Sequence, residues 1–256
     1  MLPTYPIPYR RALLACAFLL LAGTALAQGG PPMVTDDPGT PGNGHWEINV
    51  GAIQSRTAGR RELAAPDADI NYGWGDTIQL KADIPLVTAT PGGQGSRTGL
   101  GDGDFGVKWR FVEEEQAGFS LSTYPQYTRN LLASSNRRDV TAPGHAFFLP
   151  VELSADIGGG FSIAAEVGRN FVSAPDTKND WQAGFVLAHD CVEGVECLAE
   201  VHQTQAPGNH QTLLNLGLRW KLEESLTLLA AAGRDFGTAG DEQLHSLVYI
   251  GLQITR

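Results

Sequence analysis

Charged side chains recur at every second position along several segments of this 256-residue chain. In residues 104–111, Asp104, Lys108 and Arg110 alternate with large apolar side chains, so an extended backbone places the charges on one face. Charges gathered on one surface can pair with each other, or their field can select charged solutes. The acidic residues at such positions are Glu47, Asp69, Asp83, Asp104, Glu152, Asp156, Glu166 and Glu200, and the basic ones are Lys81, Lys108, Arg110, Arg219 and Lys221.

His202 lies two positions from Glu200 within an expected strand, on the same face. A histidine next to a carboxylate could serve a serine nucleophile as general base. The sequence has no Gly-x-Ser-x-Gly, phosphate-loop or His-Glu-x-x-His motif, so we predict no catalytic residues, no metal site and no cofactor. A lipid-modifying hydrolase embedded in a membrane stays open as the enzymatic alternative, and it would depend on His202.

Two cysteines, Cys191 and Cys197, flank the short segment Val-Glu-Gly-Val-Glu. Neighbouring cysteines across a tight turn usually pair in an oxidising compartment. Free thiols or a metal site are the alternatives, but only His189 and Asp190 lie close enough to supply further ligands. We therefore expect a disulfide.

The N-terminal residues have the features of an export signal. Arg10 and Arg11 precede the apolar run 12–21, and Ala25-Leu26-Ala27 fits a cleavage site. We predict a signal peptide over residues 1–27; a buried N-terminal helix is the alternative. Cleavage removes two arginines and changes the formal charge from −10 to −12, which argues against a nucleic-acid partner.

The rest of the chain predicts a strand-rich protein. Residues 28–44 are rich in proline and glycine and are expected to form an ordered strap. The strap would precede a β-barrel over residues 45–256. Alternation continues over segments of roughly the 9–11 residues that cross a bilayer when tilted. The twelve expected strands are 45–53, 67–74, 77–87, 104–111, 118–128, 146–157, 161–172, 181–189, 196–205, 212–222, 226–236 and 245–255. Short connections alternate with mostly longer ones.

The apolar face could be the core of a soluble sandwich or the lipid-facing surface of a membrane barrel. Glycines within the strands favour the barrel, because they fall on the polar face, where a narrow lumen is crowded. They are Gly51, Gly73, Gly106, Gly168, Gly184, Gly217, Gly233 and Gly251. Four tryptophans, Trp46, Trp74, Trp109 and Trp220, would lie near one rim, and Trp181 near the other. We predict an all-β, antiparallel transmembrane barrel with short periplasmic turns and longer outer loops.

One stretch resembles a known family. Residues 34–49, Val-Thr-Asp-Asp-Pro-Gly-Thr-Pro-Gly-Asn-Gly-His-Trp-Glu-Ile-Asn, are similar to the opening of the outer-membrane barrels named after the MetA pathway of phenol degradation, and the closing segment 249–253 fits as well. The resemblance implies an outer-membrane location and the passage of small, often aromatic or hydrophobic compounds. It carries over no binding residues. Many outer-membrane barrels end in phenylalanine, whereas this chain ends in Ile254-Thr255-Arg256.

The expected function is therefore passive transport of a small solute across an outer membrane. The partners would be the lipid bilayer with its lipopolysaccharide, the machinery that assembles outer-membrane barrels, and the solute. In this barrel the charged positions above, together with His202, would line the lumen. Two interpretations stay open for them, a packed lumen braced by ion pairs and a polar pore that filters solutes. A barrel that does not conduct and serves a structural role is a third functional possibility.

Overall fold

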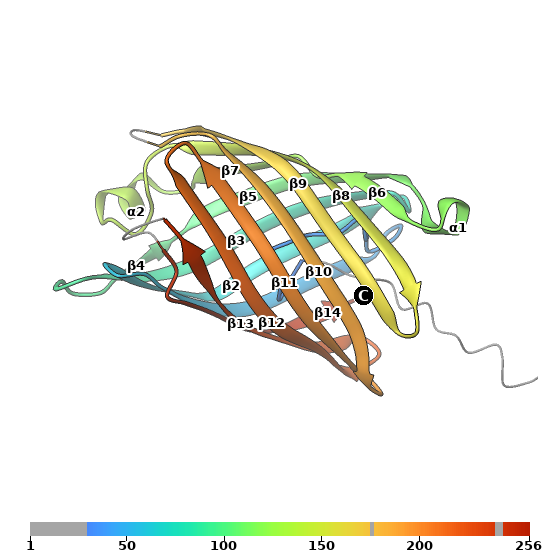
Figure 1. Ribbon diagram of the computed structural model, residues 1–256. Helices are drawn as coiled ribbons and strands as arrows, with labels where there is room; N and C mark the ends of the chain where they lie inside the picture. Colours follow the sequence, from blue (N-terminus) through green and yellow to red (C-terminus); the bar gives the residue numbers. More distant parts are fainter. Residues whose placement is uncertain (1–29, 175–176, 239–242) are drawn as a thin grey trace, which may run out of the picture.

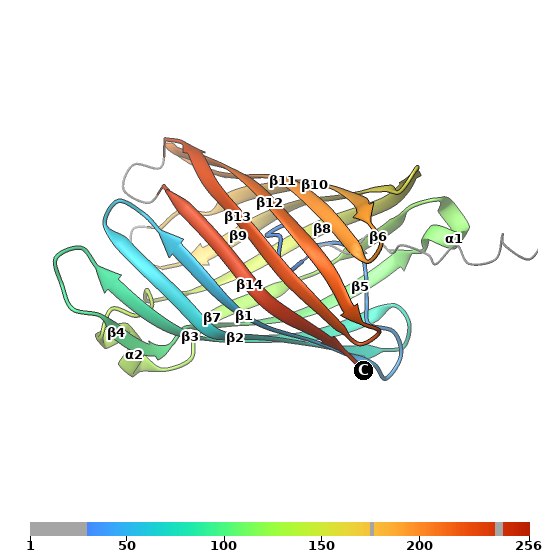
Figure 2. The same ribbon diagram turned by 90° about the horizontal axis from the view of Figure 1, so that it is seen from below.

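The computed structural model describes residues 30–174, 177–238 and 243–256. The predicted signal peptide, residues 1–27, lies outside these residues, as do Gln28 and Gly29 of the predicted strap. The described strands form one antiparallel sheet that curves into a barrel and closes where β1 pairs with β14 (Figure 1, Figure 2). The strands are β1 (Trp46–Arg56), β2 (Arg60–Trp74), β3 (Ile78–Pro91), β4 (Arg97–Leu100), β5 (Asp102–Val112), β6 (Ser120–Thr123), β7 (Gln126–Asn130), β8 (His145–Gly158), β9 (Phe161–Ser173), β10 (Asp180–Val192), β11 (Val195–Ala206), β12 (Asn209–Glu223), β13 (Leu226–Gly237) and β14 (Ser246–Thr255).

Two pairs of these strands share a position in the barrel wall. β4 and β5 both pair with β3, and β6 and β7 both lie between β5 and β8. The fourteen described strands therefore make a closed barrel of twelve, which confirms the predicted fold class. The expected strand 118–128 is interrupted at Tyr124-Pro125, because proline has no amide hydrogen to donate to a neighbouring strand.

The two ends of the barrel differ in their connections. One end, here called the turn end, carries the connections 75–77, 113–119, 159–160, 193–194 and 224–225 and the C-terminus; α1 (Glu114–Ala117) lies in the second of these. The opposite end, the loop end, carries the longer connection 131–144 with α2 (Ala133–Arg137). Most loop-end connections are longer, as predicted. Connections 57–59 and 207–208 are tight, because the strands beside them extend further than the alternation indicated.

β2 shows why the alternation failed in one place. The strand begins at Arg60 rather than at residue 67, and its pairing with β3 shifts between Ala64 and Asp67. A bulge adds a residue to one strand and so changes which residues face each side. Residues 67–74 alternate regularly, but the bulge interrupts the alternation on the N-terminal side of Asp67. The strand itself continues through Pro66 to Arg60.

The barrel is apolar outside and polar inside. In β5, Val107 is 48% and Trp109 is 54% exposed, whereas Lys108 between them is 2% exposed. Four exposed tryptophans, Trp46, Trp74, Trp109 and Trp220, lie on strands near the turn end, and Trp181 lies near the loop end. This arrangement is the reverse of a soluble protein and fits two interfacial aromatic girdles. The prediction that the apolar face points outward is confirmed. The described residues include no helix with the length and apolar composition to cross a bilayer.

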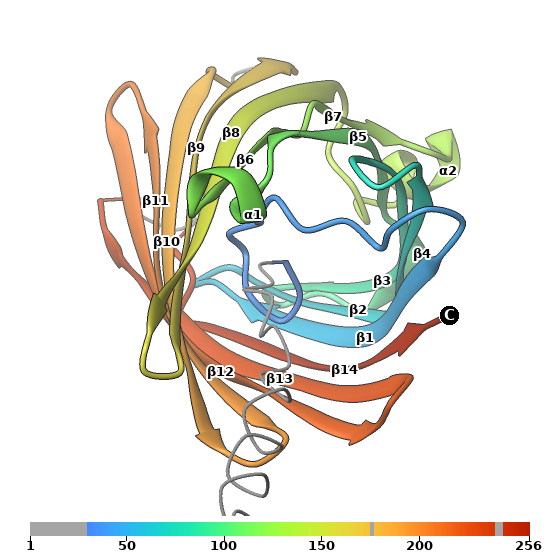
Figure 3. The same cartoon turned by 90° about the vertical axis from the view of Figure 1, so that its right-hand side faces the viewer.

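The strap, residues 30–44, folds inside the barrel. Figure 3, a view onto the turn end, shows this segment crossing the interior before it joins β1. Gly44 donates a backbone hydrogen bond of 2.9 Å to the carbonyl of Gly73 in β2. A side chain at Gly73 would overlap the carbonyl of Gly42, and one at Gly184 would overlap Thr35. Glycines on the lumenal face thus provide the space that the strap fills.

Candidate functional site

Glu200 of β11 holds the middle of the strap. Glu200 is 3% exposed, and its carboxylate accepts hydrogen bonds from the backbone amides of Val34 (3.0 Å) and Thr35 (2.6 Å). The side-chain amide of Asn215 in β12 donates a third bond of 3.0 Å. A buried carboxylate costs free energy unless its oxygens are hydrogen-bonded. These contacts therefore hold the strap in place and also stabilise the buried carboxylate of Glu200.

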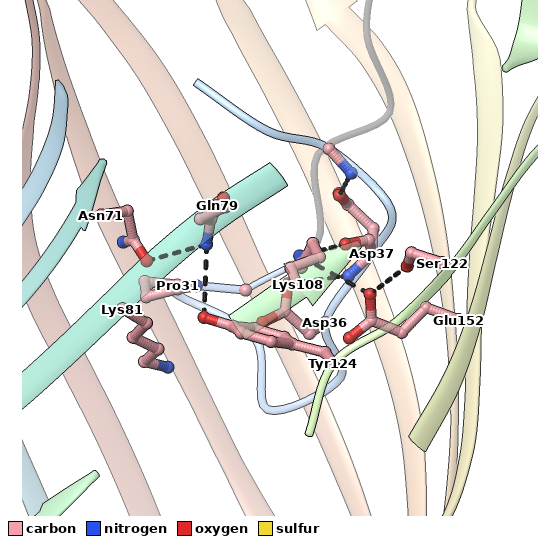
Figure 4. A network of polar contacts seen from close by, with 12 residues as sticks. Pro31, Asp36, Asp37, Asn71, Gln79, Lys81, Lys108, Ser122, Tyr124 and Glu152 are labelled. Atoms are coloured by element: carbon pink, nitrogen blue, oxygen red, sulfur yellow. Dashed lines mark hydrogen bonds and ion pairs between the residues drawn. The ribbon is translucent and has the colours of Figure 1, made fainter. Parts of the chain in front are cut away.

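Lys108 of β5 holds the next part of the strap (Figure 4). Its ammonium lies 2.8 Å from the carboxylate of Asp36 and also donates to the carbonyl of Asp37. On the barrel side, Glu152 of β8 is 3.6 Å away, and the ring of Tyr124 is 4.6 Å from the ammonium. Lys108 is therefore surrounded by acceptors from both the strap and the wall, which is the arrangement a buried cation requires.

Arg219 of β12 holds the beginning of the strap. Its guanidinium pairs with Glu196 of β11 at 2.9 Å and donates to the carbonyls of Gly30 (3.3 Å) and Pro31 (3.4 Å). The strap is thus bound at three points by side chains that project from β5, β11 and β12. We call Glu200, Lys108 and Arg219 the three anchors.

The two strap carboxyl groups differ in their ionisation. Burial alone would raise the pKa of Asp36, but the charges of Lys108 and Lys81 and the hydrogen bonds from Lys108 and the Asp37 amide together outweigh burial and hold that pKa below its usual range. Burial raises the pKa of Asp37 to about 7, and the charges of Lys108 and Arg219 only partly oppose this rise. One oxygen of Asp37, Oδ2, has no hydrogen-bond partner among the described residues.

This raised pKa predicts that the strap binds more weakly as the pH rises. The pKa of Asp37 is about 7 in the docked strap and near 3.8 in a released one. Docking is therefore strongest below the lower pKa and weakens as the pH rises from the lower pKa to the higher one. The equilibrium constant for docking falls by at most roughly tenfold per pH unit between about pH 5 and 7. Modification of Thr35→Cys by a charged thiol reagent measures strap release, and its rate is expected to rise with pH relative to the same cysteine in an Asp37→Asn background. An unchanged ratio would contradict the prediction.

A cavity of about 510 Å³ lies between the strap and the loop end. Strap residues 30–34 and 36 form part of its lining, together with side chains from β1, β2, β3, β5, β7, β8, β9, β10 and β14. Five of the charged residues singled out in the sequence line it: Asp69, Lys81, Asp83, Asp104 and Glu166. On the other side of the strap, Glu47 lines a much smaller cavity of about 30 Å³ with Lys108 and Asp36.

The remaining charged positions lie elsewhere. Arg110 donates to the carbonyl of Asp76 at the turn end (2.8 Å), and Asp156 and Lys221 are exposed at that end. The structure therefore divides the charged residues into strap anchors with their partners, cavity-lining residues and residues of the turn-end mouth.

His202 has no serine within hydrogen-bonding contact in the described part of the chain. It is 6% exposed, and its Nε2 has no hydrogen-bond partner there. The oxygens of its neighbour Glu200 are already occupied by the strap amides and Asn215. The described residues also hold no group of three or more potential ligands for a metal ion. Nothing in this geometry favours hydrolysis.

The predicted disulfide is present. Cys191 and Cys197 are bonded across the β10–β11 turn, with their Cα atoms 5.9 Å apart. The two cysteines therefore belong to the scaffold and not to the lumen.

The strap residues that bind the anchors were missed from the sequence. Asp36, Asp37 and Thr35 lie in a proline- and glycine-rich segment, and their partners are more than 70 positions away in the sequence. Tyr124, which is fully buried beside Lys108, was likewise not among the predicted site residues. The one available signal was the set of lumenal glycines, which indicated that something approached the wall closely.

Comparison with known proteins places the fold. No protein-family model matches the sequence, and no curated protein matches it. Among solved structures, the COG4313 outer membrane channel from Pseudomonas putida F1 has a TM-score of 0.67 and 11% identity, covering 90% of this chain and 100% of that one. The KdgM porin (TM-score 0.56, 8% identity) and the NanC porin (0.56, 11%) each cover 81% of this chain and 98% of their own. At these identities the likeness concerns the fold, and the chain has the fold of outer-membrane channel barrels.

Proposed function

We propose that this protein is an outer-membrane channel through which small organic molecules diffuse. The observation that carries the proposal is the cavity of about 510 Å³ inside a barrel whose outer surface is apolar and bears two aromatic girdles. A volume of this size is typical of sites for small organic ligands. The strap narrows the lumen without filling it, so passage would be restricted to small solutes.

We further propose that the chain belongs to the MetA-pathway family of barrels, on the similarity of residues 34–49. In the structure this segment spans most of the strap and the beginning of β1. The solutes would then be small and often aromatic or hydrophobic. Cleavage after Ala27 would leave the strap at the N-terminus of the mature protein, and the assembly machinery would insert the barrel into a bilayer containing lipopolysaccharide.

Swelling of proteoliposomes tests the channel. Purified protein is expected to admit a pentose and the neutral aromatic solute phenyl glucoside faster than empty liposomes do, and to exclude a trisaccharide. Liposomes containing heat-denatured protein are the control. Swelling no faster than that of the control, together with no current in planar bilayers, would refute the channel and favour a structural barrel.

A further inference from the structure

The cavity wall carries a continuous row of acidic side chains. Asn49 pairs with Asp69, Asp69 with Asp83, and Asp83 with Asp104. Residues paired directly across antiparallel strands project from the same face of a sheet. Asn49 of β1 and the three aspartates of β2, β3 and β5 therefore form one row across four neighbouring strands, and all four line the cavity. We call these residues the acidic row.

The acidic row is not neutralised by the protein. Besides Asp36, which pairs with Lys108, five carboxyl groups line the cavity, against the single ammonium of Lys81 in the described lining. Lys81 reaches Asp69 at 3.9 Å. One ammonium can balance one carboxylate, so acidic groups outnumber cations in this wall. A charged wall of low polarisability focuses its field into the space it encloses.

Two buried groups at the cavity lack the partners they require. Asn49 is 1% exposed, and although its amide donates to Asp69 (3.2 Å) and Glu47 (3.3 Å), its oxygen has no donor among the described residues. Glu166 of β9 is 6% exposed, and no hydrogen bond or ion pair reaches it within the described chain. A buried acceptor without a donor costs free energy, so a donor in the cavity would stabilise the oxygen of Asn49, and a cation there would pair with Glu166.

Apolar and aromatic side chains form another part of the lining. Phe148 of β8, Tyr249 of β14 and Ile53 of β1 contribute side chains, and the strap adds Met33 and Val34. An aromatic face attracts a cation, and the apolar surface accommodates hydrocarbon. The cavity thus combines a negative wall with surfaces that suit an organic body.

We propose that the cavity selects organic cations, with an ammonium group at the acidic row and a hydrocarbon or aromatic body against Phe148, Tyr249 and Met33. This inference rests on the proposed channel function and specifies its substrate class. It predicts that permeation depends on the sign of the solute's charge when the size and the aromatic ring are held constant.

Reversal potentials in planar bilayers test this under a concentration gradient of the salt phenyltrimethylammonium benzenesulfonate, whose two ions are similar in size. The wild-type channel is expected to pass the cation over the anion by about tenfold or more. The double variant Asp83→Asn, Asp104→Asn is expected to reduce this ratio by about threefold or more. Glu224→Gln, at an exposed position of the turn end, is the matched control and should leave the ratio unchanged.

The outcomes separate the two proposals. Current with equal permeation of the two ions overturns the cation selectivity and leaves the channel intact. An unchanged ratio in the double variant, whose folding is checked by heat-modifiable mobility on gels, overturns the assignment to the acidic row. Absence of current with every ion overturns the proposed channel, and the substrate class with it. The wild-type measurement alone is decisive if the double variant does not fold.

Discussion

Deletion of residues 30–41 is expected to increase the single-channel conductance by about threefold or more, because conductance is governed by the narrowest part of a pore. The strap lies across the lumen and bounds the cavity on the side facing the turn end. Its removal joins this cavity to the turn-end mouth. The barrel itself does not depend on the strap for closure, since β1 begins at Trp46 and pairs with both β2 and β14.

The deletion retains residues 42–44, of which Gly44 bonds to Gly73 of β2 and Gly42 accepts from the amide of His45, just before β1. Heat-modifiable mobility and circular dichroism are expected to show an intact barrel. Conductance equal to that of the full chain, in a folded variant, would mean that the strap does not limit the current. A rise in conductance with no change in the size of admitted sugars would mean that the constriction lies elsewhere.

Glu200→Ala is expected to release the strap while leaving the barrel closed. The substitution removes the acceptor of the Val34 and Thr35 amides and of Asn215, and leaving buried donors without an acceptor costs about 1–3 kcal/mol each. Conductance should therefore approach that of the deletion variant, with frequent transitions between two levels. Planar-bilayer recordings of both variants in the same salt give the comparison.

Two variants sharpen this result. Glu200→Gln keeps an oxygen that can accept from Thr35 and is expected to restore part of the wild-type behaviour. Glu115→Ala, at an exposed position in α1, removes a carboxylate far from the strap contacts and should have no effect. Equal conductance of Glu200→Ala and wild type would show that the other two anchors, Lys108 and Arg219, hold the strap alone.

The alternation of residues 104–111 was sufficient to predict β5, whereas its inverted orientation was predicted from the glycines on the polar faces and the tryptophans near the rims. Each strand in this barrel contacts lipid on one face, so the pattern is local and readable from the sequence. The bulge at Ala65-Pro66 was not predictable in this way, because it shifts the pattern by one residue, and a broken pattern resembles a loop. β4 was not predicted for a related reason, since its residues lie in a glycine-rich stretch without clear alternation.

The site was less predictable than the fold. Lys108 and Glu152, which pair with each other, could be assigned to the polar face of their strands, but Asp36, the other partner of Lys108, lies in a segment without periodicity. Contacts between residues so distant in sequence leave no local pattern. The acidic row was visible as three separate residues, Asp69, Asp83 and Asp104, and only the register of β2, β3 and β5 shows that they are neighbours.

The path of the strap has a consequence for its motion. Its first described residues contact Arg219, near the turn-end terminus of β12, and its last ones bond to Gly73, beside the turn-end tryptophan Trp74. The strap therefore enters and leaves the barrel at the same end and is not threaded through it. The strap acts as a ligand that is covalently tethered to its own barrel, so its rebinding is intramolecular. The short link to β1 sets the effective concentration of the strap at its binding site. Such a segment can withdraw and return without the wall opening, and a free peptide of the same sequence would compete with it poorly.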